Sequence, residues 1–196
     1  MKDRLMFTPF FLGVIFNFCA SSIMHTFECV SEKVLEMTSR IDYIGITLNI
    51  IGSIVSFSYF AFYGQSVLQV TYFALTCLLG IPCIILQTRK ALTPKTIRVA
   101  IFVSFGLFSS LPFTHMLVQN GPGLFGAESV KSFLKMGTLY LSGAFVYARH
   151  LPEKWYPGRF DYFLHSHQIM HVMAVCAAAY HYKGLCELAQ HHLDHC

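Results

Sequence analysis

The sequence predicts an all-α, polytopic membrane helix bundle, and three observations support this fold class. The chain has 196 residues, of which 55% are hydrophobic and only 12% are charged, whereas soluble domains usually carry roughly 25% charged residues. The apolar residues gather in long runs, most of them near the ~20 residues that a helix needs to cross a membrane. No polar segment between the runs is long enough to fold separately, so residues 1–196 are expected to form a single transmembrane domain.

Six spans are expected, at about residues 6–27, 41–63, 67–87, 97–118, 132–148 and 166–188. Polar connections separate most of them, including the turn-rich segment Asn120–Gly126 and the segment Pro152–Asp161, which is expected to be an ordered turn with aromatic side chains at interface depth. The ionisable residues singled out within the spans lie near a predicted end, where they are expected to reach the interface. These are Asp42, Arg98, Lys135, Lys183 and Glu187.

The basic residues predict the orientation, because Lys and Arg near span ends favour the cytoplasmic side. The loops after the first, third and fifth spans hold nine of them: Lys33, Arg40, Arg89, Lys90, Lys95, Arg98, Arg149, Lys154 and Arg159. The opposite side holds five: Lys2, Arg4, Lys131, Lys135 and Lys183. Both termini of a six-span chain are therefore expected outside, with the three basic loops in the cytoplasm.

A competing interpretation treats residues 1–22 as a cleaved signal peptide, with Lys2 and Arg4 as its charged region. Cleavage would leave five spans and would place the segment Arg89–Arg98 outside, against the charge rule. The six-span interpretation is therefore favoured.

Two histidines four residues apart, His167 and His171, begin the last span. That spacing places both imidazoles on one helix face. His25 ends the first span, and in the predicted topology all three rings reach the cytoplasmic side. Three imidazoles with one position left for water form the ligand set of a catalytic zinc centre, so these three residues are the candidate zinc ligands.

Asp42 begins the second span on the same side, where its carboxylate could hold a metal-bound water and accept its proton. The alternatives for Asp42 are a cap on the second span or an ion pair with Arg40. Ser21 lies one helical turn before His25 and is a candidate outer-shell residue, although a hydrogen bond within its own helix is the common role of such a serine. Ser166 is a candidate cap for the last helix.

Other histidines are weaker candidates. His181 lies ten residues beyond His171, about 15 Å further along a helix, and is expected to be a hydrogen-bonded interior residue. The tail His191-His192-Leu193-Asp194-His195-Cys196 is rich in metal ligands but has no surrounding scaffold, so adventitious binding is expected there. A basic stripe for nucleic acid and a glycine-rich phosphate loop are not found, so no nucleic-acid partner is expected.

At these residues the chain resembles the progestin and adipoQ receptor family, and within it the adiponectin receptors. The matching segments are Ser21-Ser22-Ile23-Met24-His25-Thr26, Ser31-Glu32-Lys33-Val34, Ile41-Asp42-Tyr43-Ile44-Gly45-Ile46, Pro152-Glu153, Pro157-Gly158-Arg159-Phe160-Asp161 and Ser166-His167-Gln168-Ile169-Met170-His171. They occur in the family's order along nearly the whole chain.

The resemblance implies a seven-helix receptor with a cytoplasmic amino terminus and an outer carboxyl terminus, and the plasma membrane is the expected location. It implies one zinc ion near the inner leaflet, held by His25, His167 and His171, with Asp42 contacting it through water. Hydrolysis of ceramide to a fatty acid and a sphingoid base is also implied. Two departures are Val30, where the family often has a second histidine, and the absence of the family's first helix and cytoplasmic amino-terminal region. That absence puts adaptor binding in doubt.

Three functions compete on this basis. The first is a zinc-dependent lipid amide hydrolase of the ceramidase type, with ceramide or fatty acid bound in the bundle. The second is a receptor for an extracellular protein hormone in which zinc only ties the spans together, or an inactive truncated variant. A carrier or channel has little support, because ionisable residues do not continue from the inner polar cluster across the bilayer.

Overall fold

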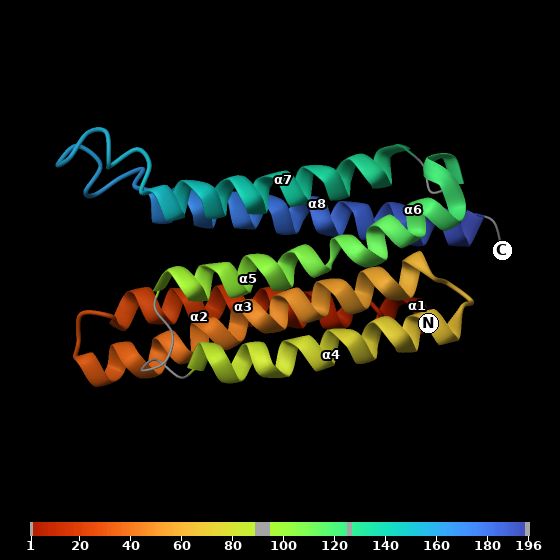
Figure 1. The fold of residues 1–196 in the computed structure, drawn as a ribbon, viewed down its shortest axis with the longest axis horizontal. Helices are drawn as coiled ribbons and strands as arrows, with labels where there is room; N and C mark the ends of the chain where they lie inside the picture. The colour runs from red at the N-terminus through yellow and green to blue at the C-terminus, as the bar shows by residue number, and fades with distance from the viewer. Residues whose placement is uncertain (1, 89–94, 125–126, 195–196) are drawn as a thin grey trace. The chain divides into compact units, whose positions relative to one another are not determined.

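The computed structural model describes residues 2–88, 95–124 and 127–194, and within those ranges the chain forms eight helices (Figure 1). They are α1 (Lys2–Leu5), α2 (Thr8–Phe27), α3 (Glu32–Ala61), α4 (Ser66–Thr88), α5 (Lys95–Phe108), α6 (Ser110–Leu124), α7 (Ala127–Arg149) and α8 (Ser166–Asp194). The predicted all-α class is confirmed. Several residues used above lie outside the described ranges, among them Arg89, Lys90, Gly126, His195 and Cys196.

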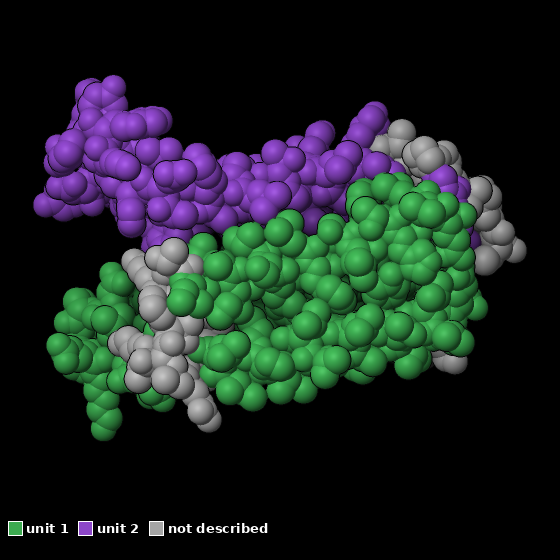
Figure 2. Space-filling view, in the orientation of Figure 1, with its two compact units in different colours: residues 1–119 green, residues 120–196 purple. Residues whose placement is uncertain are grey.

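The chain divides into two compact units, residues 1–119 and residues 120–196 (Figure 2). The first unit contains α1 to α5 and most of α6. The second contains the end of α6, where Gly121 adopts a positive φ of 70° and kinks the helix, followed by the long helices α7 and α8.

Four of the described helical segments are long and apolar enough to cross a membrane: Asp3–Phe27, Glu32–Ala61, Ser66–Leu86 and Ile97–Gly121. They overlap the first four predicted spans. The fifth and sixth predicted spans coincide with α7 and α8, whose 23 and 29 residues give them the length to cross a membrane. Their crossing of the membrane stays a prediction.

Helix α3 begins well before the predicted second span. Ser31 has extended backbone angles and its side chain accepts a hydrogen bond from the Val34 amide at 3.2 Å, which is the geometry of an N-cap. The helix then runs for 30 residues, although its first turns are rich in charged residues. Asp42 therefore lies inside the helix, and the interpretation of Asp42 as its cap is wrong.

Small residues let α2 and α3 pack with their backbones in close contact. A Cβ atom added at Gly52 would lie 2.2 Å from the Pro9 carbonyl oxygen, and one at Gly45 would lie 2.9 Å from the Asn17 Cα. Gly13 faces α3 in the same way, since a Cβ atom added there would lie 2.7 Å from the Leu48 carbonyl oxygen. Such small-residue contacts are a common means of helix association in membranes.

A buried apolar cluster joins α3 to α4 and α5. Ile54, Cys83 and Phe105 form its centre, and Ile50, Ile51, Ile101, Phe102 and Phe108 pack around it. Just after the C-terminal end of α3, the Phe62 ring stacks on the Tyr72 ring with centroids 5.1 Å apart. Tyr72 in turn shares a hydrogen bond of 2.8 Å with His115 Nδ1 on α6. These contacts hold α3 in the middle of the first unit.

In the second unit, α7 and α8 pack side by side along their lengths (Figure 1). The Ser129 hydroxyl donates to the Gly184 carbonyl oxygen at 3.2 Å, and the Ser132 hydroxyl donates to Glu187 at 3.1 Å. Towards the other end, Gly143 approaches the Met170 backbone on α8. This pairing positions the first turns of α8, which carry the histidine pair.

We expect Gly52→Ala to lower the free energy of unfolding by about 1–3 kcal/mol, because the new methyl group overlaps the Pro9 backbone. Gly106→Ala is the matched control, since a Cβ there meets nothing within 4 Å, and alanine is the better helix former by about 0.5–1 kcal/mol. Thermal unfolding of the two variants in detergent measures the difference. Equal stability of Gly52→Ala and the parent protein would contradict the close helix contact.

Candidate metal centre

His167 and His171 lie in the first two turns of α8, with their ring centroids 4.7 Å apart. The expected i, i+4 arrangement on one helix face is therefore present. Histidines at this spacing on a helix are a recurring way to bind zinc with two nitrogen donors. Both side chains are partly buried.

The ring of Tyr147 on α7 packs edge-to-face against His167, with centroids 5.1 Å apart and an interplanar angle of 89°. This contact limits rotation of the His167 imidazole from the side of α7. Tyr147 was not identified from the sequence, because its distance along the chain from His167 hides the contact.

Glu153 caps α8 from the preceding loop. One carboxylate oxygen accepts a hydrogen bond from the Ser166 backbone amide at 2.9 Å, and the other accepts the Ser166 hydroxyl. The first backbone amides of a helix lack partners within the helix and favour negative charge. The Ser166 hydroxyl therefore donates to a carboxylate, and the prediction that it caps a backbone amide is not what the structure shows.

Gln168 adds a second tie between the loop and the first turn of α8. Its side-chain oxygen accepts from the Leu164 amide at 2.7 Å, and its nitrogen donates to the Tyr162 carbonyl oxygen at 3.0 Å. Leu164 has a positive φ of 61°, a conformation that is uncommon for residues other than glycine. The residues on both sides of His167 are thus attached to the loop.

Burial opposes ionisation of Glu153, but hydrogen bonds from the Ser166 hydroxyl and from backbone amides outweigh it and lower the pKa of Glu153. The carboxylate is thus ionised at neutral pH. The pKa of Glu153 is lower in the folded chain than in the unfolded chain. Ionised Glu153 therefore stabilises the fold at pH values above its pKa in the unfolded chain. This contribution to stability is lost as the pH falls through the pKa of Glu153 in the folded chain.

In the first unit, Asp42 and Ser21 are both buried, with Asp42 only 7% exposed. Ser21 and His25 both lie close enough to the Asp42 side chain to favour its charged form. His25 is in the last turn of α2 and its Nδ1 lies 3.3 Å from the Glu28 carboxylate. The first unit therefore brings together three of the residues identified from the sequence.

The structure decides against the alternative partner of Asp42. Arg40 forms its ion pair with Glu36, at 2.6 Å. The nearby residue Tyr43 accepts a hydrogen bond from the Arg98 guanidinium at 3.1 Å, and that guanidinium lies over the Tyr43 ring. Arg98 and Asp42 are both buried, so the prediction that these two side chains reach the interface is wrong.

His181 follows the sequence expectation, and the adventitious binding expected of the tail stays a prediction. His181 is buried on α8 beside Met136 and Phe133 of α7, as expected for an interior residue. The described part of the tail contains the neighbouring rings of His191 and His192, 5.8 Å apart.

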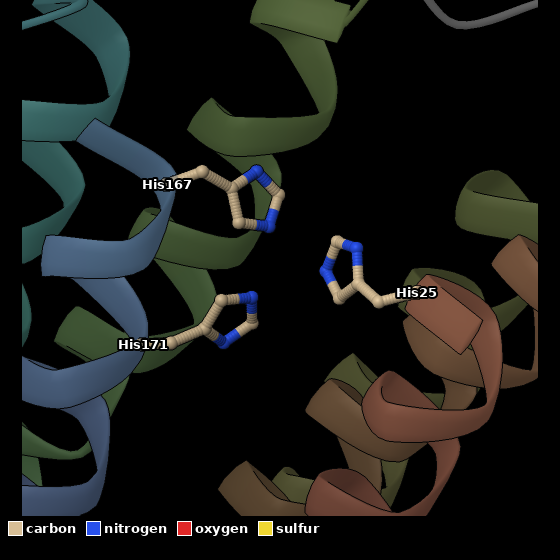
Figure 3. Close-up of side chains that lie close together, drawn as sticks. All are labelled: His25, His167 and His171. Carbon is tan, nitrogen blue, oxygen red and sulfur yellow. The ribbon is translucent and has the colours of Figure 1, made fainter. Parts of the chain in front are cut away.

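Figure 3 draws the three imidazoles that could hold a metal ion, His167 and His171 from α8 and His25 from α2. Imidazole nitrogen is a ligand for zinc, copper, iron and nickel. The number and type of donors therefore fit a transition-metal ion, and Asp42 lies beside one donor.

These helices and donors define the class of protein: an integral membrane protein of several apolar helices with a candidate three-histidine metal centre. The family model described as Haemolysin-III related matches residues 1–182, and the chain belongs to this family.

Curated relatives agree with this assignment. The chain is 35% identical over 196 residues to the adiponectin receptor protein of Drosophila melanogaster, covering 97% of this chain and 44% of that protein. It is 35% identical to progestin and adipoQ receptor-like protein 1 of Caenorhabditis elegans, covering 96% and 44%. Heptahelical transmembrane protein 5 of Arabidopsis thaliana is 33% identical, covering 92% and 49%. The predicted resemblance is confirmed, and the chain spans about half the length of these relatives.

We expect Glu153→Gln to lower the stability of the second unit by about 1–2 kcal/mol, because the amide replaces a charged acceptor at the start of α8. The stability of the Glu153→Gln variant should also change less than that of the parent protein as the pH falls below about 4.5, the usual pKa of glutamate. Hydrogen exchange of the α8 amides at several pH values measures both effects.

Glu128→Gln is the matched control, since Glu128 pairs with Lys131 near the start of α7. It should leave exchange at the start of α8 unchanged. Identical exchange profiles for Glu153→Gln and the parent protein would show that the Glu153 cap is not formed.

Proposed function

We propose that this adiponectin-receptor-like protein is a zinc-dependent lipid amide hydrolase acting near the inner leaflet. The observation that carries the proposal is the set of three imidazoles with a buried carboxylate beside one of them. In this proposal His25 at the end of α2 completes a ligand set with His167 and His171 on α8.

A zinc ion held by three histidines leaves a position for water, lowers the pKa of that water to ~7 and polarises a carbonyl group. The residues of the chain do the rest. Tyr147 and the Glu153 cap hold the α8 imidazoles in place. Ser21, which lies close to Asp42, would orient its carboxylate.

Asp42 would be the general base. It accepts the proton of the attacking water, whose oxygen bonds to the amide carbonyl carbon, and it then gives that proton to the leaving nitrogen as the carbon–nitrogen bond breaks. The products are a fatty acid and an amine. Burial keeps bulk water away from Asp42, and a base that is fixed in position loses little entropy on reaction.

Ceramide is the proposed substrate class. Two features support a lipid amide: α2 and α3, which carry His25 and Asp42, are long and apolar enough to cross a membrane, and the family resemblance to adiponectin receptors implies ceramide. Ceramide or the released fatty acid would occupy the bundle among these helices.

The proposed location is the plasma membrane, with the carboxyl terminus outside and the basic loops in the cytoplasm. The distribution of Lys and Arg over the loops supports this orientation. The proposed polar site, at the ends of α2 and α8, then faces the inner leaflet.

The second candidate function is a hormone receptor in which zinc is structural. The name of the Drosophila relative, adiponectin receptor protein, favours it, and an extracellular protein hormone would then be the partner. A three-histidine centre would serve such a receptor by tying α2 to α8, and Asp42 would have no reaction to catalyse.

We expect purified protein to contain close to one zinc ion per chain and His167→Ala to lose most of it, because two histidines bind zinc much more weakly than three. Elemental analysis after extensive dialysis measures the metal content. The control is the double variant His191→Ala, His192→Ala, which removes tail imidazoles outside the proposed set and should keep the zinc. Loss of zinc from the tail variant alone would identify adventitious binding and refute the centre.

Asp42→Asn should keep its zinc and lower the release of fatty acid from ceramide by about 10²–10⁴-fold, the usual contribution of a general base. Product release by protein in mixed micelles, with the zinc content of the same sample, measures both properties. Unchanged release would refute the role of Asp42. A zinc-loaded parent protein that releases no fatty acid, and whose Asp42→Asn variant still signals, would favour the receptor with structural zinc.

A further inference from the structure

The loop of residues 150–165, between α7 and α8, presents large apolar side chains to its surroundings. We call it the aromatic loop. Trp155 is 66% exposed and Tyr162 is 86% exposed. Tyr156, Phe163 and Leu164 are exposed as well. Five such side chains in ten residues form the kind of apolar surface that soluble proteins rarely leave uncovered.

The exposure is not a consequence of an irregular chain, because the aromatic loop is held by its own hydrogen bonds. The Lys154 amide donates to the His150 carbonyl oxygen at 2.8 Å, and the Trp155 amide donates to Pro152 at 2.9 Å. The Arg159 amide donates to Tyr156 at 3.2 Å. The first part of the aromatic loop is thus hydrogen-bonded within itself, while Trp155 and Tyr156 remain exposed.

The charges around these rings are mainly basic at the surface. Arg149, Lys154 and Arg159 are exposed. Of the two acids in the aromatic loop, Glu153 uses its carboxylate to cap α8, which leaves Asp161 as the exposed one. Exposed tryptophan and tyrosine interleaved with Lys and Arg are typical of protein segments at the interface between membrane and water.

We infer that the aromatic loop inserts its rings into the headgroup layer of an anionic leaflet. Trp155 and Tyr162 each combine an apolar body with a polar tip, which suits that layer. Lys154 and Arg159 supply charge that complements acidic headgroups, at about 1 kcal/mol per residue near the surface. A lipid surface fits this mixture better than a protein, whose interface core is usually depleted of lysine.

Lipid contact by the aromatic loop would also set the depth of the histidine pair. Glu153 and Gln168 attach the loop to the first turn of α8, so the level of the loop in the membrane determines the level of His167. That this depth would suit a lipid substrate rests on the proposed function. The lipid contact of the aromatic loop does not depend on that function.

Trp155 tests this inference directly, because it is the single tryptophan of the chain. The full chain is reconstituted in three-to-one phosphatidylcholine and phosphatidylserine vesicles, with and without lipids brominated near the headgroup. We expect brominated lipid to remove most of the tryptophan emission and the acrylamide quenching constant to be several-fold lower than for the unfolded chain. Lys154→Gln with Arg159→Gln should weaken the lipid quenching, and pure phosphatidylcholine should do the same.

The control is Trp155→Phe with Phe145→Trp, which moves the reporter to an exposed position on α7. It should be quenched by brominated lipid without dependence on Lys154 and Arg159. Trp155 that is open to acrylamide and unaffected by brominated lipid would overturn the inference and leave the loop available to a protein partner. Shielding from both quenchers would overturn it too, by placing Trp155 inside the protein. Zinc content and amide hydrolysis of the same samples test the proposed function separately.

Discussion

The close approach of α2 and α3 is the constraint on which the first unit depends. Hydrocarbon offers no hydrogen-bonding partners, so a buried carboxylate such as Asp42 needs partners within the protein. Gly45 and Gly52 remove the side chains that would separate the two backbones, and Ser21 can then reach Asp42 from the neighbouring helix. A bulky residue on this seam would affect the polar group as well as the packing.

In the second unit, contacts with the preceding loop fix the start of α8, the helix that carries the histidine pair. Local capping would involve one side chain near Ser166. Instead Glu153 reaches the helix from the far side of the loop, and Gln168 reaches back from the helix to the loop. The orientation of the imidazoles is thus linked to the conformation of the whole loop.

The sequence predicted what depends on composition and on short periodicity. Apolar length located the helices, and the i, i+4 spacing of His167 and His171 placed both rings on one face, because each rule acts within one helix. The errors concern contacts between helices and helix ends. Arg98 is buried because Tyr43, on another helix, accepts its hydrogen bond and stacks under it.

The start of α3 and the cap by Glu153 also differ from the prediction because they depend on helix ends and on tertiary contacts. Helix α3 extends beyond its apolar run because Ser31 caps it and polar residues continue it, so hydrophobicity alone placed its start too late. Glu153 is separated from Ser166 by a loop whose path depends on tertiary structure. The sequence predicts an ordered turn at Pro152–Asp161, but the contact of Glu153 with Ser166 becomes visible only in the fold.

The length of α3 has a consequence for how molecules meet Asp42. Thirty helical residues span about 45 Å, against a hydrocarbon core of ~30 Å, so the polar first turns extend past the core. With Ala61 at the opposite boundary, Asp42 lies about 28 Å away, just inside the hydrocarbon. A lipid reaches such a carboxylate by lateral diffusion in the plane of the bilayer. The rate at which that lipid meets Asp42 is then governed by its mole fraction in the bilayer. Adding inert lipid lowers this mole fraction even when the amount of the lipid in the whole sample is unchanged.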